Sequence, residues 1–144
     1  MIEDYNKVTS VHGICFYQGN VLLVHFDGRG FNFPGGHIEK VETPEEAFHR
    51  EAFEECYVKG PINYIGDIEV SHEENPLYNA ESKYPFIGKM FYRMDIQESL
   101  TFLREYETLS RIWVEPEQIP YVVNDHELIH IVLQAALSIK PSYM

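Results

Sequence analysis

The chain has 144 residues, of which 44% are hydrophobic and 14% aromatic, and its formal net charge is −12. This length suits one domain spanning residues 1–144, and the apolar share argues for a packed core rather than disorder. The negative charge disfavours long DNA or RNA as a partner, because their phosphates would be repelled. A divalent cation could still bridge the protein to a small polyphosphate.

The sequence shows no sign of export or membrane insertion. Two cysteines, Cys15 and Cys56, are too few for a disulfide framework and are interpreted as small core side chains. The N-terminus lacks a basic region followed by an apolar run, and no apolar stretch is long enough to span a bilayer. The sequence therefore predicts a cytoplasmic protein with no membrane partner.

Strand-forming segments precede the first expected helix. Residues rich in Val, Ile, Leu, Phe and Tyr predict strands at 8–17 and 21–26, joined as a hairpin, and a short extended segment at 31–33. Pro34 disfavours helix in the residue before it. Gly35 and Gly36 then allow a sharp turn or a close approach of the backbone to a ligand.

A helix is expected from Thr43 to about Cys56. Thr43 can cap it, Pro44 suits the first helical position, and Glu46 completes a capping box. Its apolar positions repeat at helical spacing and predict a face toward the core: Ala47, Phe48, Ala52, Phe53 and Cys56.

The second half of the chain predicts further strands and a last helix. Strands are expected at 62–71, 86–96 and 110–115, with a polar loop at about 73–84 and a helix from 124 or 125 to about 139. Apolar positions Leu128, Ile131, Val132, Ala135 and Leu137 are expected to face the core. The order of strands, helix, strands and helix predicts an α/β fold in which helices pack on a mixed sheet.

Three carboxylates share one face of the first helix. Glu51, Glu54 and Glu55 are related as i, i+3 and i+4, and Arg50 precedes them. Like charges at this spacing destabilise an isolated helix, but they suit hard divalent cations such as Mg²⁺ and Mn²⁺. Taken alone, the pattern fits a solvated acidic helix face equally well.

The spacing around these carboxylates closely resembles the Nudix box. Five residues separate Gly36 from Glu42, and seven more lead to Arg50-Glu51; Ala52-Phe53, then Glu54-Glu55, and Cys56-Tyr57-Val58 complete the motif. Pro34-Gly35 before it and Thr43 to Ala47 within it also resemble the family's usual sequence. The box covers only 23 residues, yet it specifies many identities at fixed intervals.

Two positions depart from the family's pattern. Tyr57 stands where the family usually has glycine at the helix end, and Val41 replaces a glycine common before the first glutamate. A glycine at the end would adopt the left-handed cap without strain, so we expect Tyr57 to end the helix differently. Neither position supplies a metal ligand.

The resemblance implies an α/β/α sandwich with a mixed sheet and a role for each box residue. It implies that Glu51 and Glu55 bind Mg²⁺ or Mn²⁺, with Glu54 assisting and the Gly35 carbonyl contributing. Arg50 would orient Glu51, whereas Glu42 and Gly36 would support the loop and helix. The family often has another acidic residue before a late tryptophan, and Glu107, with Glu105 as its substitute, occupies that place before Trp113.

The resemblance also implies an activity, the hydrolysis of a phosphoanhydride bond in a small nucleotide or nucleoside diphosphate derivative. Metal ions would activate a water, and a glutamate, either in the helix or Glu107, would accept its proton. The 73–84 loop contains Tyr78, which could stack on a base, and Asn79, which could hydrogen-bond its edge. Both are predicted to bind substrate.

Two other hypotheses remain open. A Nudix-fold module could bind a nucleotide without efficient hydrolysis. The segment from His126 to His130 reads His-Glu-x-x-His, a zinc-protease motif, although no third ligand is evident. Because family members often form homodimers, a homodimer is expected.

Overall fold

The computed structural model describes residues 8–71, 86–123 and 126–139. Its elements are β1 (Val8–Tyr17), β2 (Asn20–Phe26), β3 (Gly30–Asn32), β4 (Gly35–His37), α1 (Pro44–Cys56), β5 (Val58–Lys59), β6 (Ile62–Ser71), β7 (Phe86–Asp95), β8 (Glu98–Ser99), β9 (Thr108–Val114), a 3-10 turn (Pro116–Gln118), α2 (Ile119–Val122) and α3 (His126–Leu137). The predicted 73–84 loop, with Tyr78 and Asn79, lies outside the described residues.

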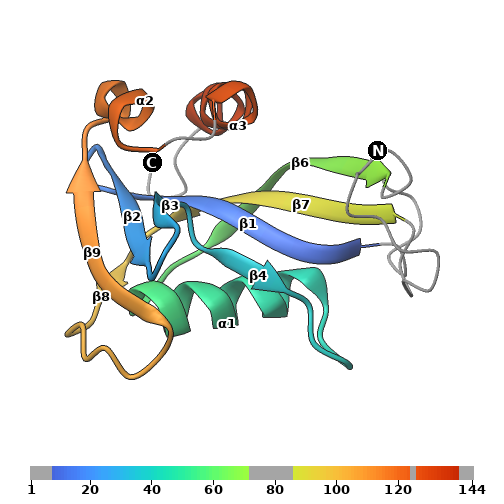
Figure 1. Cartoon of the computed structure of the whole chain (residues 1–144), viewed down its shortest axis with the longest axis horizontal. Coiled ribbons are helices and arrows are strands. Elements are labelled where there is room, and N and C mark those ends of the chain that lie inside the picture. Colours follow the sequence, from blue (N-terminus) through green and yellow to red (C-terminus); the bar gives the residue numbers. More distant parts are fainter. Residues whose placement is uncertain (1–7, 72–85, 124–125, 140–144) are drawn as a thin grey trace.

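The main sheet is mixed. Its strands follow the order β3-β2-β1-β7-β6, with β4 paired to β1 and β9 paired to β2. The central β1–β7 pair is parallel, and the other pairs are antiparallel. In Figure 1, α1 covers one face of this sheet, while α2 and α3 cover the other. The predicted α/β/α sandwich is therefore confirmed.

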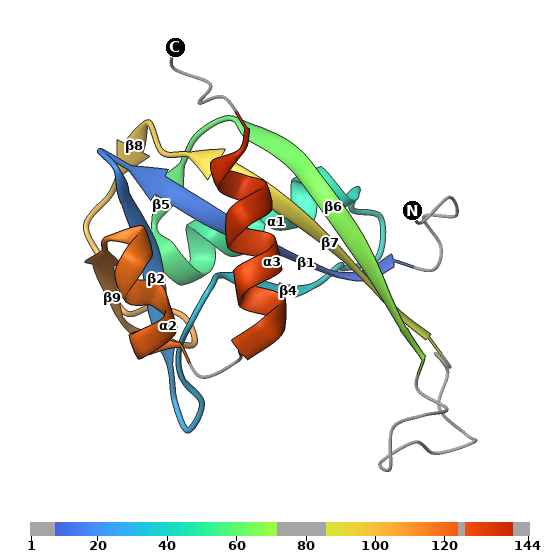
Figure 2. The same ribbon diagram turned by 90° about the horizontal axis from the view of Figure 1, so that it is seen from above.

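Each face of the sheet has its own hydrophobic core. On the α1 side, Phe48, Ala52 and Cys56 pack against inward residues of β1, β2 and β7. On the other side, Val132 and Leu133 of α3 pack against a second set from the same strands. Figure 2 shows α3 lying across the strands that α1 covers from below. Strand residues alternate between the two cores because successive side chains point to opposite faces.

The start of α1 follows the prediction. Thr43 accepts a hydrogen bond from the Glu46 amide, the Glu46 carboxylate accepts one from the Thr43 amide, and proline follows the cap. The buried face includes Ala47, Phe48, Ala52 and Cys56, as predicted, whereas Phe53 is only half-buried. Short-range hydrogen bonds of this kind depend on local sequence, which explains the agreement.

The prediction for the end of α1 was wrong. Tyr57 is the C-cap residue and adopts the left-handed conformation, with φ 59° and ψ 42°, that glycine would adopt. Its amide donates to the Phe53 carbonyl in the manner of an ordinary left-handed cap. The strain is offset by packing, since the Tyr57 side chain is only 4% exposed.

Two further expectations need correction. Of the two alternatives for Gly35 and Gly36, the sharp turn is wrong, because both residues lie in β4. There a β-carbon on Gly35 would meet the Val11 carbonyl, and one on Gly36 would meet the Glu51 carboxylate. On α3, Ile131 and Leu137 are exposed, and the buried residues of this helix include Val132, Leu133 and Ala136. The contacts of α3 with β6 and β7 decide which of its apolar residues face inward.

Within the described residues, no helix is long and apolar enough to cross a membrane.

Candidate active site

Arg50 is the hub of the ion-pair network on α1. Its Nε donates to Glu42 Oε2 at 2.7 Å, and its two terminal nitrogens donate to Glu42 Oε1, Glu51 Oε1, Glu54 Oε2 and the His37 carbonyl at 2.8–3.3 Å. This fork fixes the guanidinium, and the hydrogen bonds from Arg50 lower the pKa of Glu42. Glu42 also accepts the Glu39 amide at 2.8 Å, so the loop before α1 is attached to the helix.

Glu55 is a buried carboxylate that the backbone of β4 contacts. Its Oε1 accepts the Gly35 amide at 2.7 Å, and the residue is 5% exposed. Burial raises the pKa of Glu55 to about 8; the Gly35 hydrogen bond opposes that effect, and the nearby charges of Glu51 and Glu107 add to it. An ionised Glu55 therefore needs a cation that the side chains around it do not fully supply.

Glu51 lies beside Glu55 on the same helix face. Its carboxylate contacts Arg50 at 2.8 Å and borders Gly36, where a β-carbon would stand 2.8 Å from a carboxylate oxygen. Burial raises the pKa of Glu51, and the hydrogen bond from Arg50 partly reverses the rise. Gly36 thus leaves the room in which this carboxylate sits.

The remaining acidic residues differ in position. Glu54 is half-exposed and faces Arg50 at 3.3 Å, outside the pocket wall. Glu107, at the end of the loop before β9, lines the pocket together with Glu51 and Glu55, whereas Glu105 does not. The structure therefore brings Glu107 to the helix carboxylates across more than 50 residues of sequence.

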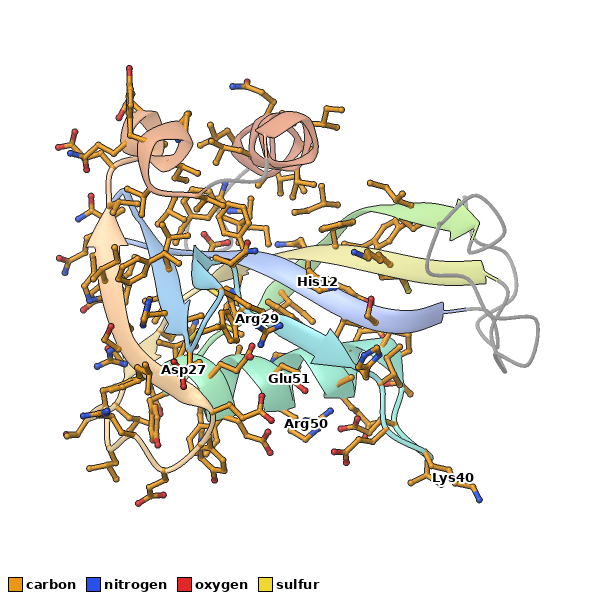
Figure 3. All side chains as sticks on the ribbon, viewed as in Figure 1. His12, Asp27, Arg29, Lys40, Arg50 and Glu51 are labelled. Carbon is orange, nitrogen blue, oxygen red and sulfur yellow. The ribbon has the colours of Figure 1, made fainter. Side chains whose placement is uncertain are left out.

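These residues border a pocket of about 550 Å³. It is lined by Ser10, His12, Phe26, Arg29, Asn32, Phe33, Gly35, Gly36, His37, Glu39, Glu51, Glu55, Lys89, Phe91, Glu107 and Val132. Figure 3 shows Arg29 and Glu51 facing the same space between the β2–β3 hairpin and α1, with Lys40 pointing away from it. The pocket thus combines carboxylates with two cations, Arg29 and Lys89, and with three phenylalanine rings, Phe26, Phe33 and Phe91.

Sequence reasoning did not assign a second group of pocket residues, which comes from β1 and β7. In the parallel β1–β7 pair, Ser10 is opposite Lys89 and His12 is opposite Phe91, so all four lie on one face of the sheet. His12 Nε2 lies 3.2 Å from Ser10 Oγ, and burial lowers the pKa of His12 to about 4, so its ring is neutral at pH 7. The strand pairing that brings these residues together is not visible in the sequence, where they lie almost 80 positions apart.

The donor set fits a hard divalent cation. Glu51 and Glu55 offer carboxylate oxygens, and Glu55 has a raised pKa that a nearby cation would lower. Among the described residues, no three His, Cys, Asp or Glu side chains form a ready-made metal cage. Magnesium does not require one, because it keeps several waters and is bound by one or two carboxylates together with substrate phosphates.

The fold is an α/β domain in which a mixed sheet lies between helices, and an arginine-centred carboxylate network lies on the helix that follows a Gly-Gly strand. The NUDIX domain family model matches residues 7–133. The chain therefore belongs to the NUDIX domain family.

Relatives with known names agree with this assignment. YtkD of Bacillus subtilis, a provisionally named 8-oxo-dGTP diphosphatase, is 39% identical over 86 residues, covering 59% of this chain and 48% of YtkD. Nudix hydrolase 16, mitochondrial, of Arabidopsis thaliana is 30% identical over 102 residues, covering 68% of this chain and 54% of the relative. The chain thus matches about half the length of these curated relatives.

A solved structure shares the fold over most of the chain. The crystal structure of a mutant form of the Bacillus subtilis pyrophosphohydrolase BsRppH superposes with a TM-score of 0.72 and 25% identity. The match covers 90% of this chain and 81% of BsRppH.

The His-Glu-x-x-His segment lies at the start of α3, and the family assignment does not favour the zinc-protease hypothesis.

Proposed function

We propose that this chain hydrolyses a phosphoanhydride bond in a small nucleotide with the help of Mg²⁺ or Mn²⁺. The observation that carries the proposal is the pocket that Glu51, Glu55 and Glu107 line together with the cations Arg29 and Lys89. The named relatives support the same class, since one is a provisionally named 8-oxo-dGTP diphosphatase and one solved neighbour is a pyrophosphohydrolase.

In this proposal Glu51 and Glu55 hold the divalent cation, Glu54 assists, and the Gly35 carbonyl contributes an oxygen. When bound, the cation would neutralise phosphate charge and lower the pKa of a nearby water. Arg50 keeps Glu51 in place through the 2.8 Å hydrogen bond, and Glu42 keeps Arg50 in place from the other side. These hydrogen bonds orient the Arg50 and Glu51 side chains before substrate binds.

A glutamate that lines the same pocket is proposed to accept the proton of the attacking water. Glu107 is the favoured base, because it lines the pocket and forms no ion pair with the described residues, whereas Glu54 is paired with Arg50. The base removes a proton from the attacking water, the water oxygen bonds to phosphorus, and the bond to the bridging oxygen breaks. Arg29 would stabilise the charge that develops on the phosphoryl oxygens.

A second group of pocket residues is proposed to contact the nucleoside. Phe33 and Phe91 offer ring faces, and neutral His12 beside Lys89 offers hydrogen-bonding groups. Tyr78 and Asn79, outside the described residues, remain proposed substrate contacts. No long nucleic acid or membrane is proposed as a partner; a homodimer and a cytoplasmic location stay proposals from the sequence.

The decisive experiment compares Glu55→Gln with Glu117→Gln. The first removes the buried carboxylate, and the second removes a carboxylate that is exposed near α2. With nucleoside triphosphates, 8-oxo-dGTP, ADP-ribose, nucleotide sugars and dinucleoside polyphosphates as a panel, the wild type should hydrolyse substrate only with Mg²⁺ or Mn²⁺. The triphosphates would release phosphate or pyrophosphate, whereas the other compounds would release two phosphate monoesters or nucleotides. Glu55→Gln should lose at least about 100-fold in kcat, the order seen when a catalytic electrostatic group is removed. Nucleotide binding without turnover in the wild type would favour a binding module instead.

A further inference from the structure

Glu107 lies at the end of an irregular loop, and that loop is attached to the end of α1. The loop comprises residues 100–107, between β8 and β9, and is called here the Glu107 loop. At its start, the Leu100 amide donates to the Tyr57 carbonyl at 2.8 Å. Just beyond its end, Thr108 Oγ1 donates to the Glu55 carbonyl at 2.8 Å and is buried. Both ends of the loop are therefore hydrogen-bonded to backbone carbonyls at the C-terminal end of α1.

Tyr57 supplies the attachment in the middle of this loop. Its hydroxyl oxygen accepts the Glu105 amide at 2.9 Å, two residues before Glu107. Its ring lies 5.2 Å from the Phe102 ring, edge to face, and 6.0 Å from the Tyr106 ring. One buried side chain thus contacts the loop at three points.

Backbone strain is present on both sides of this hydrogen bond. Tyr57 has φ 59°, and Arg104, directly before Glu105, has φ 56°, and neither is glycine. A left-handed conformation in a residue other than glycine costs about 1 kcal/mol or more and persists only where surrounding contacts enforce it. A glycine at position 57 would remove its share of the strain, but it has no side chain to reach the loop.

We propose that Tyr57 is a positioning residue that holds the Glu107 loop so that Glu107 faces Glu51 and Glu55 across the pocket. The proposal rests on the function proposed above, in which Glu107 accepts the proton. It gives the departure from the family's usual glycine a role in the reaction rather than in helix termination alone.

The test uses Tyr57→Phe, which keeps the ring and removes the acceptor for the Glu105 amide. We expect kcat to fall about tenfold, less than the hundredfold that a 1 Å displacement can cost, with KM within about twofold because the substrate contacts are unchanged. Hydrogen exchange at the Glu105 amide should accelerate. Tyr92→Phe is the matched control: Tyr92 is also buried and its hydroxyl donates to Glu45, away from the loop, so its kcat should stay at the wild-type level.

A double-mutant cycle separates this proposal from the proposed function. In a Glu107→Gln background, Tyr57→Phe should cause no further loss of kcat, because it acts through Glu107. Equal losses in both backgrounds, or an unchanged kcat in Tyr57→Phe, would overturn the positioning role. Wild-type turnover in Glu107→Gln would overturn it together with the choice of base. None of these three results touches metal-dependent hydrolysis itself, which fails if the wild type shows no metal-dependent turnover or if Glu55→Gln keeps full activity.

Discussion

The buried Glu55 carboxylate should make the metal-free protein less stable as pH rises. Its pKa is about 8 in the folded chain and 4.5 ordinarily. Between these values the native state binds more protons than the unfolded state, so the free energy of unfolding falls with rising pH. At 1.36 kcal/mol per pH unit the full difference is about 5 kcal/mol, and we expect about 2–5 kcal/mol after local adjustment. The stabilisation is complete below pH 4.5 and lost above pH 8.

Urea unfolding in EDTA at pH 5, 6, 7 and 8 would measure this loss. Glu55→Gln is the matched variant, since it keeps the size and removes the titration; it should show a flatter dependence on pH and exceed the wild type in stability at pH 8. Mg²⁺ should stabilise the wild type more at pH 8 than at pH 5, because the ionised carboxylate binds it. Identical pH slopes for the two proteins in EDTA would refute the reasoning.

Four further outcomes are expected. Tyr57→Gly should lower the free energy of unfolding by about 2 kcal/mol, because a buried ring is worth more than the relieved left-handed strain; urea unfolding would measure it, and an unchanged or higher stability would contradict it. Arg93→Met should cost about 3–5 kcal/mol, since it breaks the buried ion pair with Asp95 at 3.0 Å and removes the donor to two carbonyls at the end of α3. A loss under about 1 kcal/mol would count against that. Glu107→Gln should depress kcat while Glu105→Gln should not, in steady-state assays. Light scattering at high concentration should give a dimer mass, and a monomer mass would end that proposal.

Local sequence is enough to predict the helix that carries the carboxylates. Thr43, Pro44 and Glu46 set its start through contacts three residues apart. The i, i+4 spacing of Glu51 and Glu55 places both on the pocket side, as the structure shows. These features depend on residues that are close in the sequence, so the local sequence pattern is enough to predict them.

The rest of the site is assembled by contacts between distant segments. The antiparallel pairing of β4 with β1 brings Gly35 against His12, and the parallel β1–β7 pairing brings Lys89 beside Ser10. Tyr57 has a left-handed conformation, and the loop residues that pack on its ring come from more than 40 positions further along the chain. Strand register and loop packing cannot be read from neighbouring letters, because the energies that set them appear only when the whole sheet forms.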